Sequence, residues 1–127
     1  MMRARIVFLS AALWVLAAPA VACGVCIEDK VAVTYDHAVV MDATARSHVV
    51  VFAAVEAKGD AQRAARAVKS AAVRVRGVDR ATVRAAASPA ALSFALDPAV
   101  AAPEQALASI ERASPTPVKL SLLRVLR

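Results

Sequence analysis

The stretch HVVVFAAVE, residues 48 to 56, decides the fold because it is apolar on both of its faces. β-Branched residues dominate its first half, and no charged side chain occurs after His48 until Glu56. A run of this length and composition is typical of a β-strand that is covered on both sides. It therefore predicts a strand that needs packing partners above and below it.

An amphipathic helix is predicted immediately after this strand, over residues 61 to 75. Small apolar residues recur at helical spacing on one side, and basic or polar residues occupy the other. Asp60 is a candidate N-cap, because a short acidic side chain can accept hydrogen bonds from the first free amides of a helix. Gly77 stands after the last turn, where a left-handed residue commonly closes a helix.

The elements that follow complete a recognisable order. They are strands at 81–87 and 91–97 joined by a short turn, a helix that opens at Pro103-Glu104, and a strand at 118–126. The order strand, helix, strand, strand, helix, strand is the split βαβ, or ferredoxin-like, arrangement. We therefore predict an α+β fold in which a four-stranded antiparallel sheet carries two helices on one face.

Residues 27 to 45 predict an extra N-terminal helix. Ile27, Val31 and Tyr35 recur at helical spacing, although Val31 and Val33 also alternate in a way that a short strand would allow. This helix is the candidate cover for the second face of the sheet. The rival interpretation is that the second face meets another subunit.

Residues 1 to 22 resemble a signal peptide. A basic start precedes the apolar run from Ile6 to Ala18, and Ala20-Val21-Ala22 gives the small-x-small pattern of a cleavage site. The chain would then consist of a signal peptide (1–22), a cysteine-bearing segment with a helix (23–47) and a ferredoxin-like domain (48–127), located in the periplasm or secreted. If the segment is cleaved, we expect no membrane span in the mature protein. The alternatives are that the segment stays uncleaved as an N-terminal anchor, or that Cys23 carries a lipid anchor.

The charge balance is ordinary for an exported protein. Removing residues 1 to 22 takes away two of the 16 basic residues and none of the 10 acidic ones, which leaves a net charge of +4. Such a charge serves solubility, whereas nucleic-acid binding would require a basic face and a compartment that holds nucleic acid. The sequence contains no evident Ser-His-Asp set, acid–base pair or phosphate loop, so we expect neither an enzyme nor a nucleic-acid partner.

Three stretches resemble the heavy-metal-associated domain family of copper chaperones and metal-pumping ATPases. They are VRGVDRATV (75–83), ALSFALDP (91–98) and APEQALASIERA (102–113), and the resemblance covers about residues 49 to 126. The resemblance implies the ferredoxin-like fold and the handling of a soft metal ion. Members of the family bind metal through Cys-x-x-Cys at the start of the first helix, but the corresponding positions here are Ala61 and Ala64, which cannot bind a metal.

Cys23 and Cys26 are the only cysteines, and they are the predicted metal ligands. Two thiolates at this spacing can chelate a soft ion such as Cu(I) or supply half of a tetrahedral zinc site. In an oxidising compartment the pair could instead form a structural disulfide in a binding module without metal, or take part in thiol–disulfide exchange. The resemblance favours copper or another soft metal ion as the cofactor.

His37 and Met41 lie four residues apart on one face of the predicted helix, and both are soft-metal ligands. On a continuous helix His37 would lie about 16 Å along the axis from Cys26, too far for one ion to contact both. We therefore expect Met41 to pack in the core.

A set of arginines has two interpretations. A solvated helix face is the ordinary one, and a docking surface for an acidic partner protein is the other. The set comprises Arg63, Arg66, Arg74, Arg76, Arg80 and Arg84.

Overall fold

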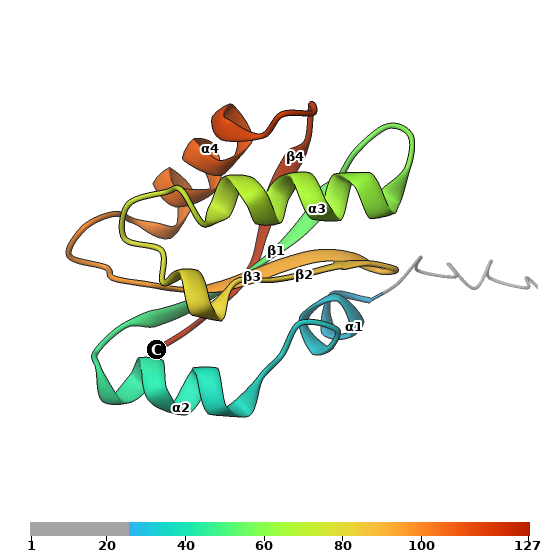
Figure 1. Ribbon diagram of the computed structural model, residues 1–127. Helices are drawn as coiled ribbons and strands as arrows, with labels where there is room; N and C mark the ends of the chain where they lie inside the picture. Colours follow the sequence, from blue (N-terminus) through green and yellow to red (C-terminus); the bar gives the residue numbers. More distant parts are fainter. Residues whose placement is uncertain (1–25) are drawn as a thin grey trace, which may run out of the picture.

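Strand β1, Val49–Glu56, lies in the interior of a four-stranded antiparallel sheet in the computed structural model, which describes residues 26 to 127 (Figure 1). The sheet order is β2-β3-β1-β4. The other strands are β2 (Arg84–Ala87), β3 (Ala90–Leu96) and β4 (Lys119–Leu126). The predicted ferredoxin-like α+β fold is confirmed.

Two helices, α3 (Ala61–Ala72) and α4 (Pro103–Ala113), cover one face of the sheet (Figure 1). The Asp60 side chain caps α3 by accepting a hydrogen bond from the Gln62 amide at 2.9 Å, as predicted. The larger hydrophobic core lies beneath these helices and includes Phe94, which is fully buried. Alternate residues of β1 point into this core, and the residues between them point to the opposite face.

The opposite face is covered by the N-terminal segment, which forms two helices instead of the one that we predicted. They are α1 (Ile27–Ala32) and α2 (His37–Ala45) (Figure 1). The break has a local cause, since Asp36 adopts an extended backbone and accepts hydrogen bonds from the amides of Ala38 and Val39 at 3.0 and 3.3 Å. An aspartate in this position starts a new helix and does not continue the previous one.

The link between α1 and α2 rests on the sheet. Ser93 on β3 is buried, and its hydroxyl donates to the Thr34 carbonyl at 3.1 Å. The Tyr35 ring stacks on Phe52 of β1 with centroids 6.4 Å apart. The second hydrophobic cluster continues from this point and contains Val31, Ala43, Val50, Phe52 and Ala95. The prediction that the N-terminal segment covers the second face is therefore confirmed.

Strand β4 contains a β-bulge that lets it contribute to both faces. Phe52 lies opposite Arg124, but the next residue of β1, Ala53, lies opposite Leu122, so Leu123 is the extra residue. Leu120 consequently joins the larger core, while Leu123 and Leu126 pack against the smaller cluster.

The predicted strand at 81–87 is shorter than expected. Residues Arg80–Thr82 form a 3-10 turn, and β2 begins only at Arg84. The Thr82 hydroxyl explains this start, because it donates to the Asp79 carbonyl at 2.6 Å and accepts from the Ala95 amide at 2.8 Å. The side chain thus replaces a strand hydrogen bond at the sheet margin.

Candidate functional site

Cys26 is the first described residue and lies in the N-cap position of α1. It is exposed, and its backbone carbonyl accepts hydrogen bonds from the amides of Asp29 and Lys30 at 3.0 and 3.2 Å. Its thiol makes no capping hydrogen bond and is therefore free to react or to bind a ligand from the solvent. Cys23, the other predicted ligand, and the predicted signal peptide lie outside the described residues.

Within residues 26 to 127, no three His, Cys, Asp or Glu side chains gather into a group suited to hold a metal ion. Met41 is 57% exposed, so the prediction that it packs in the core is wrong. It lies on α2, as does His37, whose Nδ1 is 3.3 Å from the Tyr35 hydroxyl. The separation expected between Cys26 and His37 assumed one continuous helix. Because α1 and α2 are separate helices, that expectation does not apply.

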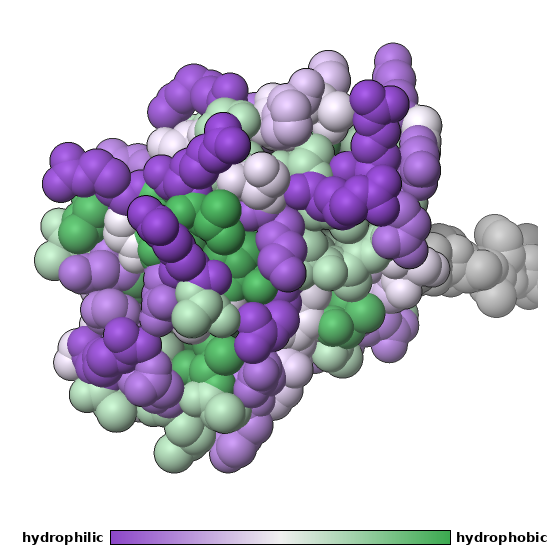
Figure 2. Space-filling view, in the orientation of Figure 1, coloured by the Kyte–Doolittle hydropathy of each residue, from purple (hydrophilic) through white to green (hydrophobic). Residues whose placement is uncertain are grey.

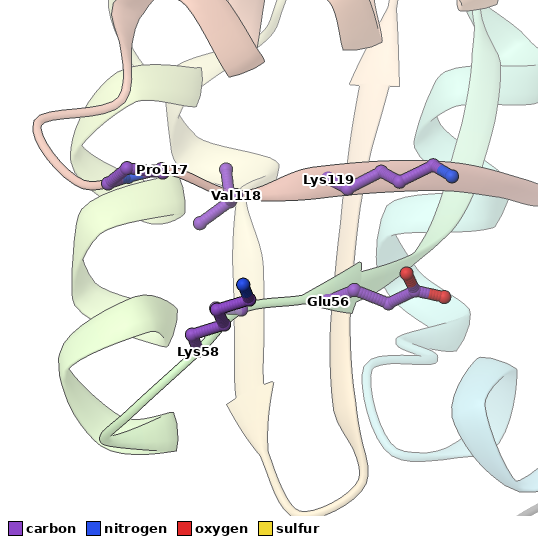
Figure 3. A pocket seen from close by; sticks show the side chains of 6 residues that line it. Glu56, Lys58, Pro117, Val118 and Lys119 are labelled. Carbon is purple, nitrogen blue, oxygen red and sulfur yellow. The ribbon is translucent and has the colours of Figure 1, made fainter.

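A groove without soft ligands lies next to the start of α3, the helix that carries Ala61 and Ala64. Ala61 begins α3, and the preceding β1–α3 loop borders an open groove of about 680 Å³. Figure 3 shows Glu56 and Lys58 on one side of this groove and Pro117, Val118 and Lys119 on the other. None of the residues that line it is a cysteine, histidine or methionine. In Figure 1 helix α1 lies at the same end of the sheet, on the opposite face.

Ion pairs link the N-terminal helices to the rest of the chain. Glu28 on α1 binds Arg124 on β4, and Asp36 lies 3.4 Å from Arg84 on β2. The hydrogen bond and charge of Arg124 lower the pKa of Glu28 below its ordinary value of 4.5. Because Glu28 is engaged in this way, Asp29 is the acidic side chain near Cys26 for which no ion pair is observed within the described residues.

A third link joins the end of α2 to the loop before β2. Arg46 binds Asp42 within its own helix and reaches Asp79 at 2.9 Å. Both carboxylates raise the pKa of Arg46, Asp42 by the larger amount. Three ion-pair links therefore surround the small apolar cluster on this side of the sheet.

The arginine set that the sequence suggested divides into two groups. Arg84 pairs with Asp36 and belongs to the N-terminal side of the sheet. The other basic residues on and near α3 are exposed, and none forms an ion pair with any acidic residue of the described chain. They are Arg63, Arg66, Lys69, Arg74, Arg76 and Arg80.

No protein-family model, curated protein or solved structure matches the chain. The resemblance to the heavy-metal-associated family therefore stays a prediction from the sequence. In the part of the chain that the structure describes, no helix is both long and apolar enough to cross a membrane.

Proposed function

We propose that this is an exported protein, periplasmic or secreted, that binds a soft metal ion, Cu(I) foremost, through the thiolates of Cys23 and Cys26. The single observation that carries the proposal is the exposure of Cys26, the first residue that the structure describes, in the N-cap position of α1. A thiol in that position can meet a second thiol three residues earlier without any change in the core. The protein would bind and pass on the ion and would not catalyse a reaction.

The surroundings of Cys26 favour an open site with two ligands. Within the described residues no three His, Cys, Asp or Glu side chains form a group that could supply most of a tetrahedral zinc site. Cu(I) accepts two soft thiolates, whereas structural zinc takes four ligands. An open site also suits transfer, because an incoming ligand can reach the ion directly.

The test is a competition titration of the reduced protein with Cu(I) and a chelator of known affinity. We expect one equivalent of Cu(I) to bind, and we expect Cys26→Ser and Cys23→Ser each to abolish the tight binding. Met41→Leu is the matched control, since Met41 is an exposed soft ligand on α2. It should leave the affinity unchanged.

Two outcomes would overturn the metal proposal. One is the absence of stoichiometric binding in the reduced protein, and the other is binding that survives in the double cysteine variant. The mass of the protein as isolated separates the remaining candidates, because a disulfide lowers it by about two mass units relative to the reduced form. A strongly negative reduction potential would then indicate a structural disulfide in a binding module, and a less negative one thiol exchange.

A further inference from the structure

The outer side of α3 carries basic residues without acidic neighbours in the same stretch of sequence to balance their charge. From residue 61 to residue 76 the chain has five basic residues and no aspartate or glutamate. All five are exposed, and none forms an ion pair within the described chain. The N-terminal side of the sheet differs, since Arg46, Arg84 and Arg124 there all bind carboxylates.

Three of these residues form a stripe along α3 and the turn that follows it. Arg63 and Arg66 lie on α3, and Arg74 lies in the turn after its last residue, Ala72. Helical spacing would place the three on one side, over about 16 Å at 1.5 Å per residue. Arg74 lines a hollow together with Ser109 of α4, and Arg112 adds a further cation there by donating to the Ser109 hydroxyl at 3.2 Å. We call Arg63, Arg66 and Arg74 the cationic stripe.

The acidic residues of α4 lie on its other side. Glu104 and Glu111 border a separate hollow with Leu120 and Leu122 of β4. The Glu111 carboxylate is moreover occupied, because it accepts the Leu120 amide at 2.7 Å. These two carboxylates therefore point away from the stripe. Asp60 lines a hollow with Arg63, but its side chain accepts the Gln62 amide and forms no ion pair with Arg63.

The stripe ends in a hollow of about 630 Å³ whose lining is partly apolar. Val75, Ala99, Val100 and Ala101 contribute to it, and Arg74, Arg76 and Ser109 complete its lining. Val100 is 48% exposed. Gly77, with a φ of +90°, makes room for it, since an added Cβ there would lie 3.2 Å from Val100. In Figure 2, hydrophilic side chains cross the upper half of the molecule, where α3 and α4 lie in Figure 1, and hydrophobic surface is exposed between them.

We propose that the cationic stripe and this hollow form a docking surface for an acidic polypeptide segment that carries one apolar anchor residue. The guanidinium groups would bind carboxylates, to which their planar donors are matched. The anchor side chain would enter the hollow over Val100 and be desolvated there, as central anchors of protein interfaces are.

A polypeptide fits this surface better than an anionic membrane does. The apolar side of α3 is buried in the core through residues such as Val68 and Ala71, so the helix has no free apolar face to insert into lipid. A hollow with a partly apolar lining can accept a protruding apolar side chain, which a lipid surface does not offer. The segments that line the hollow, residues 74–76 and 99–101, lie at the end of the molecule opposite to α1 (Figure 1), so this proposal is independent of metal binding at Cys26.

The test uses the full chain in the processed form that the cell exports, and a synthetic peptide of about eleven residues that contains glutamates and one central leucine. The length matches an extent of about 16 Å for a helical segment. We expect chemical-shift changes confined to α3, residues 97 to 101 and the adjoining side of α4. Arg74→Glu with Arg76→Glu should weaken binding about tenfold, because two favourable contacts become repulsive.

Arg127→Glu is the matched control, because Arg127 is an exposed cation outside the stripe and forms no ion pair with a described residue. It should leave the affinity within about twofold, as expected for a remote rim charge. Replacing the central leucine of the peptide by glycine should weaken binding about fivefold through lost apolar burial.

Three results would overturn the proposal. The first is that Arg127→Glu lowers the affinity for the peptide as much as the double variant does, and the second is that replacing the leucine by glycine leaves the affinity unchanged. The third is that the protein binds phosphatidylglycerol vesicles but not the peptide. The last result would assign the surface to lipid. Circular dichroism of each variant verifies that the fold is intact, so that a loss of binding reports on the surface alone.

Discussion

The two faces of the sheet are covered in physically different ways. Under α3 and α4 lie fifteen buried apolar residues, whereas the cluster under α1 and α2 has five. Ion-pair links accompany the smaller cluster, at Glu28, Asp36 and Arg46. Because exposed ion pairs contribute little stability each, the α1–α2 side should be the weaker of the two.

This difference also separates the two uses of charge. On the N-terminal side Arg46, Arg84 and Arg124 bind carboxylates of the chain itself. The basic residues of α3 form no ion pair within the described residues and remain available to an outside partner. A protein of modest net charge can thus have one face that is locally neutral and one that is strongly positive.

The largest expected effect comes from removing a ring on the α3–α4 face. Phe94→Ala should lower the free energy of unfolding by about 3–5 kcal/mol, because Phe94 is fully buried in the larger cluster. Phe52→Ala, on the other face, should cost less, since α1 and α2 can settle into the space. Urea denaturation measures both.

Phe94→Leu provides a milder variant if Phe94→Ala does not fold, with an expected loss of about 1 kcal/mol. The comparison of faces fails if Phe52→Ala destabilises the protein as much as Phe94→Ala does.

A smaller effect should follow from removing a helix cap on either side. Asp36 caps α2 and Asp60 caps α3. Replacing each by alanine should cost about 1 kcal/mol. Amide hydrogen exchange should accelerate in residues 37 to 45 for Asp36→Ala and in residues 61 to 72 for Asp60→Ala.

The residues in which hydrogen exchange accelerates show whether the two sides of the sheet unfold separately. If Asp36→Ala accelerated exchange in α3 and α4 as well, the two sides would unfold as one cooperative unit and the difference between them would be lost.

The smallest effect concerns Glu28 and pH. Because Arg124 depresses the pKa of Glu28 in the folded state below 4.5, the stabilisation is present above pH 4.5 and is lost as the pH falls through the lowered pKa. Glu28→Gln should therefore lower the midpoint of thermal unfolding slightly near neutral pH and have no effect in strong acid. Added salt should reduce the difference. A difference that persisted in strong acid would contradict a role for this ion pair.

Much of the fold could be predicted because its signals are local. The alternation of Leu92, Phe94 and Leu96 and the cap at Asp60 depend on neighbouring residues only, and the structure confirms both. The break before α2 was missed although its signal, Asp36 ahead of a new turn, is visible in the sequence. The bulge at Leu123 is marked by two adjacent leucines, but its position follows from pairing with β1.

The candidate site was less predictable because it depends on contacts between distant residues. Glu28 and Arg124 are 96 residues apart, and no spacing rule connects them. Arg84 was grouped with the surface arginines for the same reason, since its partner Asp36 comes from another element. The exposure of Met41 likewise depends on how α2 lies on the sheet.

The bulge in β4 also sets an order of assembly. Leu123 and Leu126, near the end of the chain, complete the cluster that receives α1 and α2, which are near its beginning. Because the ribosome makes the chain from its N-terminus, α1 and α2 emerge before β4. The apolar cluster on which they pack is incomplete until β4 is in place. Closing so long a loop is entropically slow. We therefore expect α1 and α2 to dock after β4, although they are synthesised before it.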